Sequence, residues 1–234
     1  MKIMISQPTL FPWLGYFNMI RQVDKFVILD DVGFNYQSWQ HRNNFKTPNG
    51  LELFTLPVIN GKKKALIKNI KIDNSQFVKK KFIKFIYSNY NKSKYYKKLE
   101  NNFINMINVA FSKNNLLNFN IEVIRWCLNF LNIKIEFVFS SQLNLQSKKI
   151  QNIIDICKNL NADEYLSAIG SKDYINGHED IFKNSNIRLI FHNYEHPSYN
   201  QLFGSFCYYA CILDLIFNEG DNSLEVIKSG NILN

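Results

Sequence analysis

The sequence predicts an α/β fold in which helices flank a mainly parallel sheet, with a β-hairpin and a lysine-rich helical lobe inserted. Three observations predict it. Short apolar runs, such as residues 3–5 and 26–29, alternate with stretches of helical periodicity. Strong turn residues at positions 47–50 (Thr-Pro-Asn-Gly) separate two alternating segments. Thirteen lysines gather in residues 61–98.

The opening of the chain predicts a strand–helix–strand unit. The apolar run at residues 3–5 ends in polar residues, as a buried strand does where it leaves a sheet. Pro12 precedes apolar residues at helical spacing, and because proline favours the first turn of a helix, we expect a helix over residues 13–22. Residues 26–29 form a second apolar run. This order within about thirty residues is typical of a βαβ unit.

The remaining elements follow from periodicity and turn residues. We expect a hairpin of residues 40–46 and 51–58, an edge strand at 66–72, helices at 76–90, 94–111 and 116–131, a strand at 135–139, a helix at 148–160, strands at 164–167 and 188–191, and a closing helix at 205–217. On the helix at 76–90 the buried side should carry Phe77, Val78, Phe82, Phe85 and Ile86. No repeat or linker interrupts the chain, so we expect one domain over residues 1–234, with 61–131 as a helical lobe within it.

The amino-acid composition limits the classes of protein to which the chain can belong. An apolar content of 46% suffices for a hydrophobic core. Four cysteines lie in apolar surroundings without zinc-site spacing, so we expect free core thiols, with Cys207 and Cys211 on the closing helix. Polar residues interrupt the first apolar run, and no run is long enough to cross a membrane, which predicts no signal peptide and a cytoplasmic location. Association with a membrane surface stays open.

Five predicted strands end in polar residues. These are Gln7, Asp30 and Asp31, Ser140 and Ser141, Ser167 with Gly170, and His192 with Asn193. In a parallel sheet all five ends share the edge at which open α/β sheets bind ligands. Aromatic residues at 34–39 follow one of these ends and favour a ligand site. The alternative is a set of helix caps and packed loops.

Acid–base chemistry has four candidate residues. His192 and His196 titrate nearest neutral pH, and Asp30 or Asp31 could orient a histidine or accept a proton itself. His196 could also be a loop residue without a role. No dinucleotide or metalloprotease motif is present, and the four histidines are too dispersed to assign as ligands, so no cofactor or metal is expected.

Substrate binding has a larger set of candidates. Gly170-Ser171-Lys172 offers backbone N–H groups and a charge to a phosphate, although it lacks P-loop spacing. Arg42 could hold a diphosphate, or could instead pair with Asp214, a carboxylate in an apolar segment. Aromatic residues could stack on a base or sugar, or pack in the core. The full set is Gln7, Trp13, Tyr16, Trp39, Arg42, Asn43, Gly170, Ser171, Lys172, Tyr199 and Gln201.

The lysine-rich stretch predicts an anionic partner. Residues 61–98 hold thirteen lysines against a single aspartate, within a chain of net charge +9. Such a patch attracts RNA, an acidic membrane surface or a phosphorylated carrier. Lys79, Lys80 and Lys84 are the residues expected to contact it. The alternative is a solvated helix face in a chain of AT-rich coding composition.

Three N-terminal segments carry a family resemblance. QPTLFPWLGYFNMI, DKFVILDDVGF and SWQHRNN, which span residues 7–44 with gaps, resemble the opening of the WbqC-like family. Shorter matches follow at residues 194–201 and 212–218. Members of this family are associated with bacterial surface-polysaccharide gene clusters, and the resemblance implies that role here.

The function expected from this resemblance and these residues is transfer of an acyl or aminoacyl group to the amino group of a nucleotide-linked sugar. The sugar nucleotide would occupy the strand-end crevice, and His196 or Asp30 would take the amine proton. The donor would be anionic, a carrier or an aminoacyl-tRNA, bound at the lysines. The competing hypotheses are a non-catalytic sugar-nucleotide-binding or scaffolding module and a nucleic-acid-binding protein.

Overall fold

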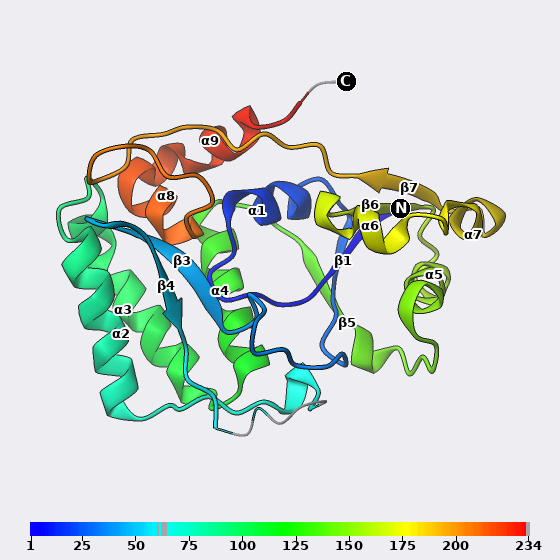
Figure 1. The fold of residues 1–234 in the computed structure, drawn as a ribbon, viewed down its shortest axis with the longest axis horizontal. Coiled ribbons are helices and arrows are strands. Elements are labelled where there is room, and N and C mark those ends of the chain that lie inside the picture. The colour runs from blue at the N-terminus through cyan, green and yellow to red at the C-terminus, as the bar shows by residue number, and fades with distance from the viewer. Residues whose placement is uncertain (60, 62–64, 233–234) are drawn as a thin grey trace.

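A five-stranded parallel sheet forms the centre of the computed structural model, which describes residues 1–59, 61 and 65–232 (Figure 1). Its order is β5-β2-β1-β6-β7, and each neighbouring pair is parallel. The strands are β1 (Lys2–Ser6), β2 (Lys25–Ile28), β5 (Glu136–Phe139), β6 (Glu164–Ser167) and β7 (Arg188–Phe191). The predicted α/β class with a mainly parallel sheet is therefore confirmed, and all five strand ends lie at one edge.

Helices cover both faces of this sheet. Side chains alternate along β1, so Met4 joins one core while Ile3 and Ile5 join the other. The first face packs against α1 (Leu14–Ile20), α4 (Leu116–Phe130), α8 (Ile212–Glu219) and α9 (Ser223–Ser229), and the second against α5 (Lys149–Asn159), α6 (Lys172–Ile175) and α7 (Glu179–Asn184). The sequence did not predict α6, α7 or α9.

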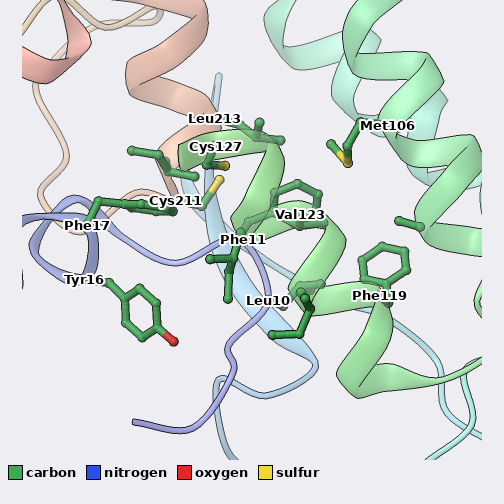
Figure 2. Close-up of a cluster of buried hydrophobic side chains, with 14 of the residues drawn as sticks. Leu10, Phe11, Tyr16, Phe17, Met106, Phe119, Val123, Cys127, Cys211 and Leu213 are labelled. Atoms are coloured by element: carbon green, nitrogen blue, oxygen red, sulfur yellow. The ribbon is translucent and has the colours of Figure 1, made fainter. Parts of the chain in front are cut away.

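A lobe extends from the first face. It consists of the hairpin β3 (Arg42–Thr47) and β4 (Gly50–Thr55) with α2 (Gln76–Tyr90) and α3 (Tyr96–Ser112), at the left of Figure 1. The predicted hairpin and helices are confirmed, and Phe45, Phe54 and Phe82 pack their rings between them. Helix α4 joins the lobe to the sheet, because Phe119 and Val123 meet residues from both sides (Figure 2). The described part of the chain also contains four 3₁₀ turns: η1 (Ile67–Asn69), η2 (Ser140–Gln142), η3 (Ile169–Ser171) and η4 (Gly220–Asn222).

Two predictions within the lobe are wrong. The segment 66–72 is not an edge strand; the N–H groups of Ile67 and Lys68 bind the carbonyls of Val32 and Asp30, which ties it to the loop after β2 as η1. Phe77 does not face the core but is 76% exposed, since the buried stripe at Val78, Phe82 and Ile86 lies about 100° further round the helix. Residues 62–64, part of the predicted lobe and lysine stretch, and residue 60 before them lie outside the described residues.

The closing helix begins later than predicted. It starts at Ile212 rather than at residue 205, because Phe203 and Tyr209 have φ of 63° and 65°, in the left-handed region that a helix cannot use. Cys207 therefore lies in a loop and is half-buried, whereas Cys127, Cys157 and Cys211 are the buried free thiols that the sequence predicts.

A buried polar cluster joins α8 to the hairpin. Tyr199 Oη and Gln201 Nε2 each donate to Asp214 Oδ2 at 2.8 Å. Lys46, only 2% exposed, donates through Nζ to Ser205 O at 2.6 Å and Cys207 Sγ at 3.1 Å. Burial raises the pKa of Asp214 to about 6, although these hydrogen bonds and the charge of Lys46 act in the opposite direction.

Arg42 is not the partner of Asp214, so that expectation is wrong. Its guanidinium donates to Gln37 O instead. Arg42 and Lys46 share a face of β3, but four residues of strand separate them by about 13 Å, and Lys46 is the one at the end near α8.

The structure predicts different costs for removing these two cations. Lys46→Met should lower the free energy of unfolding by about 3 kcal/mol, because it removes two charged hydrogen bonds and leaves Asp214 without a nearby cation. Arg42→Ala should cost less than about 1 kcal/mol, because Arg42 has no carboxylate partner. Urea denaturation of both variants measures this. Equal losses would restore Arg42 as the structural partner.

A second buried hydrogen-bonded contact, which we call the His192 contact, connects β7 to α1. Its Nε2–H donates to Asn18 Oδ1 at 2.8 Å, and Asn18 Nδ2 donates to Ile227 O at 2.8 Å. Burial, and secondarily the charge of Arg21, lower the pKa of His192 to about 4, so the ring is neutral in the folded protein.

The lowered pKa of His192 in this contact predicts that the folded protein loses stability in mild acid. The unfolded state protonates His192 near pH 6.5 and the folded state near pH 4, so its contribution is complete above pH 6.5 and is lost as the pH falls toward 4. Between pH 7 and pH 4.5 we expect wild type to lose on the order of 1 kcal/mol more than His192→Gln, which does not titrate. Urea denaturation at both pH values tests this, and parallel losses in the two proteins would contradict it.

Candidate functional site

Three adjoining cavities form one crevice along the carboxyl edge of the sheet. We call them the aromatic, central and basic cavities, of about 320, 470 and 360 Å³. Ser6 and Thr9 line both the aromatic and the central cavity, and Val32, Lys149 and Asn152 line both the central and the basic cavity. The shared walls make the three cavities one continuous crevice.

The aromatic cavity has stacking surfaces on several sides. Trp13, Tyr16, Trp39 and Tyr209 line it, and Trp39 and Tyr209 are 52% and 58% exposed. Tyr16 donates its hydroxyl to Gln7 O at 3.0 Å, and burial raises its pKa, so it stays protonated. Planar exposed rings around a hollow suit a nucleobase or the apolar face of a sugar. The structure thus brings together three of the predicted aromatic ligands and adds Tyr209, which the expected helix at 205–217 concealed.

Amide side chains hold the segment between β1 and α1 in place. Asn43 Nδ2 donates to both Leu10 O and Phe11 O at 2.8 Å, and Asn120 Nδ2 donates to Pro8 O at 3.3 Å. Gln40 Nε2 donates to Gln7 Oε1 at 2.8 Å. Figure 2 shows Leu10 and Phe11 packed against α4. Asn43 therefore lines the aromatic cavity but uses both amide hydrogens to shape it.

The central cavity receives one residue of the predicted phosphate segment. Ser171 lines it together with Gln7, Tyr174 and Lys149. Gly170 and Lys172 are exposed beside it and are not part of its wall. Lys149 is the lysine in the wall of this cavity, whereas the sequence predicts Lys172 as the phosphate contact.

The basic cavity combines two lysines with one carboxylate. Lys148 and Lys149 begin helix α5, whose first turn has no side-chain cap, and Asp31 faces them. Asp31 Oδ1 accepts a hydrogen bond from Ser140 Oγ at 2.6 Å, and Oδ2 has no partner among the described residues. Of the residues that line the three cavities, Asp31 is the one carboxylate. Lys148 and Lys149 follow the last residue of β5 by nine and ten residues. The expectation that ligands bind beyond the carboxyl ends of parallel strands could therefore have identified them.

Asp30 lies at the predicted edge but is enclosed. Ser141 donates to it twice, from its backbone N–H to Oδ1 at 2.9 Å and from Oγ to Oδ2 at 2.8 Å. These bonds join the ends of β2 and β5. With its carboxylate satisfied and buried, Asp30 positions the wall of the crevice.

His196 lies one layer behind the aromatic cavity. Its ring stacks on Trp13, with centroids 6.0 Å apart, and Tyr209 packs edge-on at 5.3 Å. Nδ1–H donates to Pro197 O at 2.9 Å, which leaves Nε2 buried and without a partner among the described residues. Burial lowers the pKa of His196, so the ring is neutral and its Nε2 is a proton acceptor. His192, in contrast, contacts α1 outside the crevice.

Besides Gly170 and Lys172, three further predicted ligands lie outside the walls of the three cavities. Tyr199 and Gln201 bind Asp214, and Arg42 binds Gln37 O. Among the described residues, no group of three His, Cys, Asp or Glu side chains could hold a metal ion. No helix among the same residues has the length and apolar character needed to cross a membrane.

Comparison with known proteins supports the resemblance seen in the sequence. A curated protein of Mycobacterium tuberculosis, named as the uncharacterized protein Rv1507c, is 28% identical over 229 residues, which cover 97% of each chain. No solved structure matches the chain. The WbqC-like protein family matches residues 7–226, a range that includes every element from α1 to α8. The chain described here is a member of the WbqC-like protein family.

Proposed function

We propose that this protein acts in surface-polysaccharide biosynthesis, as a transferase that places an acyl or aminoacyl group on the amino group of a nucleotide-linked sugar. Membership of the WbqC-like family supports the pathway. The observation that carries the proposal is the order of side chains along the crevice: stacking rings, then a lysine with hydroxyls, then a single carboxylate.

A sugar nucleotide matches this order group by group. Its base would stack on Trp39 and Tyr209 in the aromatic cavity. Its diphosphate would lie in the central cavity, where Lys149 supplies charge and Ser171 a hydroxyl. Its amino sugar would then reach Asp31 in the basic cavity.

Asp31 is the proposed proton acceptor. The amine must lose a proton as its nitrogen bonds the acyl carbon and the donor's leaving group departs with the electron pair of the broken bond. Asp31 has an oxygen available for that proton, whereas the carboxylate of Asp30 is occupied by serine. His196 can accept a proton too, but Trp13 separates it from the cavity, and we assign it the task of holding that indole.

The proposed donor is anionic, either a carrier or an aminoacyl-tRNA. The lysines expected to bind it lie on α2, at the opposite side of the molecule from α5 in Figure 1. A donor that touches both would therefore be macromolecular.

A non-catalytic sugar-nucleotide-binding module is the second candidate function. The absence of histidine and cysteine from the residues that line the three cavities favours it. It predicts the same ligand and no turnover.

The binding arrangement predicts which variants lose affinity for a nucleotide sugar. Lys149→Ala should weaken binding tenfold to about a hundredfold, because one charged contact is typically worth ~1.5–3 kcal/mol. Trp39→Ala should weaken it by roughly tenfold through lost stacking. Lys158→Ala, at the far end of the same helix, is the matched control. Calorimetric titration measures all three, and wild-type affinity in the first two would remove the crevice as the site.

The Asp31→Asn variant distinguishes between the two candidate functions, a transferase and a non-catalytic binding module. The amide keeps the shape and a hydrogen bond from Ser140 but cannot take a proton, so kcat should fall by about 10²–10⁴ while nucleotide-sugar affinity changes little. Turnover of candidate amino-sugar nucleotides with wild type and Asp31→Asn gives the answer. Wild-type turnover in Asp31→Asn would exclude Asp31 as the base, and binding without turnover by the wild type would favour the module.

A further inference from the structure

Helix α2 presents an outward face that mixes aromatic and cationic side chains. Phe77 and Tyr87 are 76% and 51% exposed, and Lys80, Lys81 and Lys84 lie exposed between them. At 3.6 residues per turn these five positions fall within an arc of about 120°. We call these five residues the α2 face.

The charge of this face is uncompensated. Residues 76–98 contain eight lysines and no acidic residue. Lys98 pairs with Asp221 and Lys79 donates to Asn108, but the three lysines of the α2 face form no ion pair with any described residue. A partner for this face must therefore bring negative charge.

The exposed rings narrow the choice of partner. A phenylalanine side chain gains nothing from a phosphate, yet Phe77 projects from the same surface as the lysines and is the more exposed of the two rings. Nucleic-acid sites that use aromatic stacking place the rings in a positively charged groove. The α2 face is the convex outer surface of one helix and contributes to none of the cavities of the crevice.

We propose that the α2 face docks on an anionic lipid surface. Phe77 enters the boundary between headgroups and acyl chains, Tyr87 lies at headgroup level, and the three lysines contact lipid phosphates and carboxylates. The proposal is independent of the nucleotide-sugar site, because α2 and the α5 end of the crevice are on opposite sides of the molecule (Figure 1). It competes with the acyl donor proposed above for Lys80 and Lys84, and a titration with tRNA decides between the two partners.

Sedimentation with lipid vesicles tests the proposal on the full chain. Wild type should bind vesicles of phosphatidylcholine mixed with phosphatidylserine, and much less those of phosphatidylcholine alone. Replacing Lys80, Lys81 and Lys84 by Ala should weaken binding by about a hundredfold, since each lysine near an anionic surface contributes roughly fivefold. Phe77→Gln should weaken it tenfold to a hundredfold. Alanine at Lys134, Lys158 and Lys183, three exposed lysines outside α2, is the matched control and should leave binding unchanged.

Insertion distinguishes lipid from other anions. A tryptophan placed at Phe77 should be quenched by brominated lipid chains, whereas simple electrostatic adsorption would leave its emission unaltered. Wild type that stays in solution with anionic vesicles, loss of binding in the control variant, or a Phe77→Trp emission that lipid does not quench would each overturn the proposal. A parallel titration with bulk tRNA tests the rival hypothesis that the α2 face binds nucleic acid. Tight binding to tRNA that depends on the three lysines, together with no binding to vesicles, would assign the α2 face to a nucleic acid.

Discussion

Two buried side-chain amides hold the backbone between β1 and α1 in a conformation that the segment would not keep alone. Phe11 has a φ of 42°, in a region that costs a residue with a side chain about 1–3 kcal/mol. Asn43 from the hairpin and Asn120 from α4 bind the carbonyls of Pro8, Leu10 and Phe11, which would otherwise be buried without partners. The same bonds attach the lobe to the carboxyl edge of the sheet. The crevice depends on this attachment, because the segment forms its floor.

Polar residues near the strand ends consequently divide into two groups. Asn43, Gln40 and Asp30 have their hydrogen-bonding capacity used within the protein, and they determine the shape of the crevice. Lys149 and one oxygen of Asp31 have no such partner in the described part of the chain, and they face the cavities. This second group can contribute most to the free energy of ligand binding, because a ligand that contacts these atoms does not have to displace hydrogen bonds within the protein. Whether a polar side chain is already hydrogen-bonded within the protein, more than its residue type, therefore distinguishes residues that shape the crevice from residues that could bind a ligand.

The sequence predicted the parts of the fold that local patterns determine. Apolar runs located the five strands, and the Thr-Pro-Asn-Gly turn located the hairpin. Helix α2 was predicted with its observed bounds, Gln76–Tyr90, yet Phe77 was placed on the wrong side because composition does not distinguish neighbours about 100° apart. The loop at 202–210 was only partly foreseeable, since Gly204, with a φ of 65°, signals a turn, whereas the left-handed residues Phe203 and Tyr209 carry no such signal.

Site residues were harder to predict because they depend on contacts between distant segments. Strand order brought Gln7 and Asp31 to one edge as expected, since that requires only parallel strands. Which cation approaches Asp214 depends on the position of β3 relative to α8, and a sequence does not show whether Arg42 or Lys46 is closer. Tyr199 and Gln201 were recognised as notable for their motif, but their partner is Asp214 within the protein.

The most direct test of this account is a crystal structure of the protein grown with a nucleotide-linked amino sugar. The account predicts continuous density along the crevice, with the base between Trp39 and Tyr209, the diphosphate beside Lys149 and the sugar amino group within hydrogen-bond distance of Asp31. It also predicts that residues 7–13 keep the same conformation with and without ligand. Density for the sugar nucleotide at any other surface, or with the base against Asp31 and the sugar against Trp39, would contradict the account.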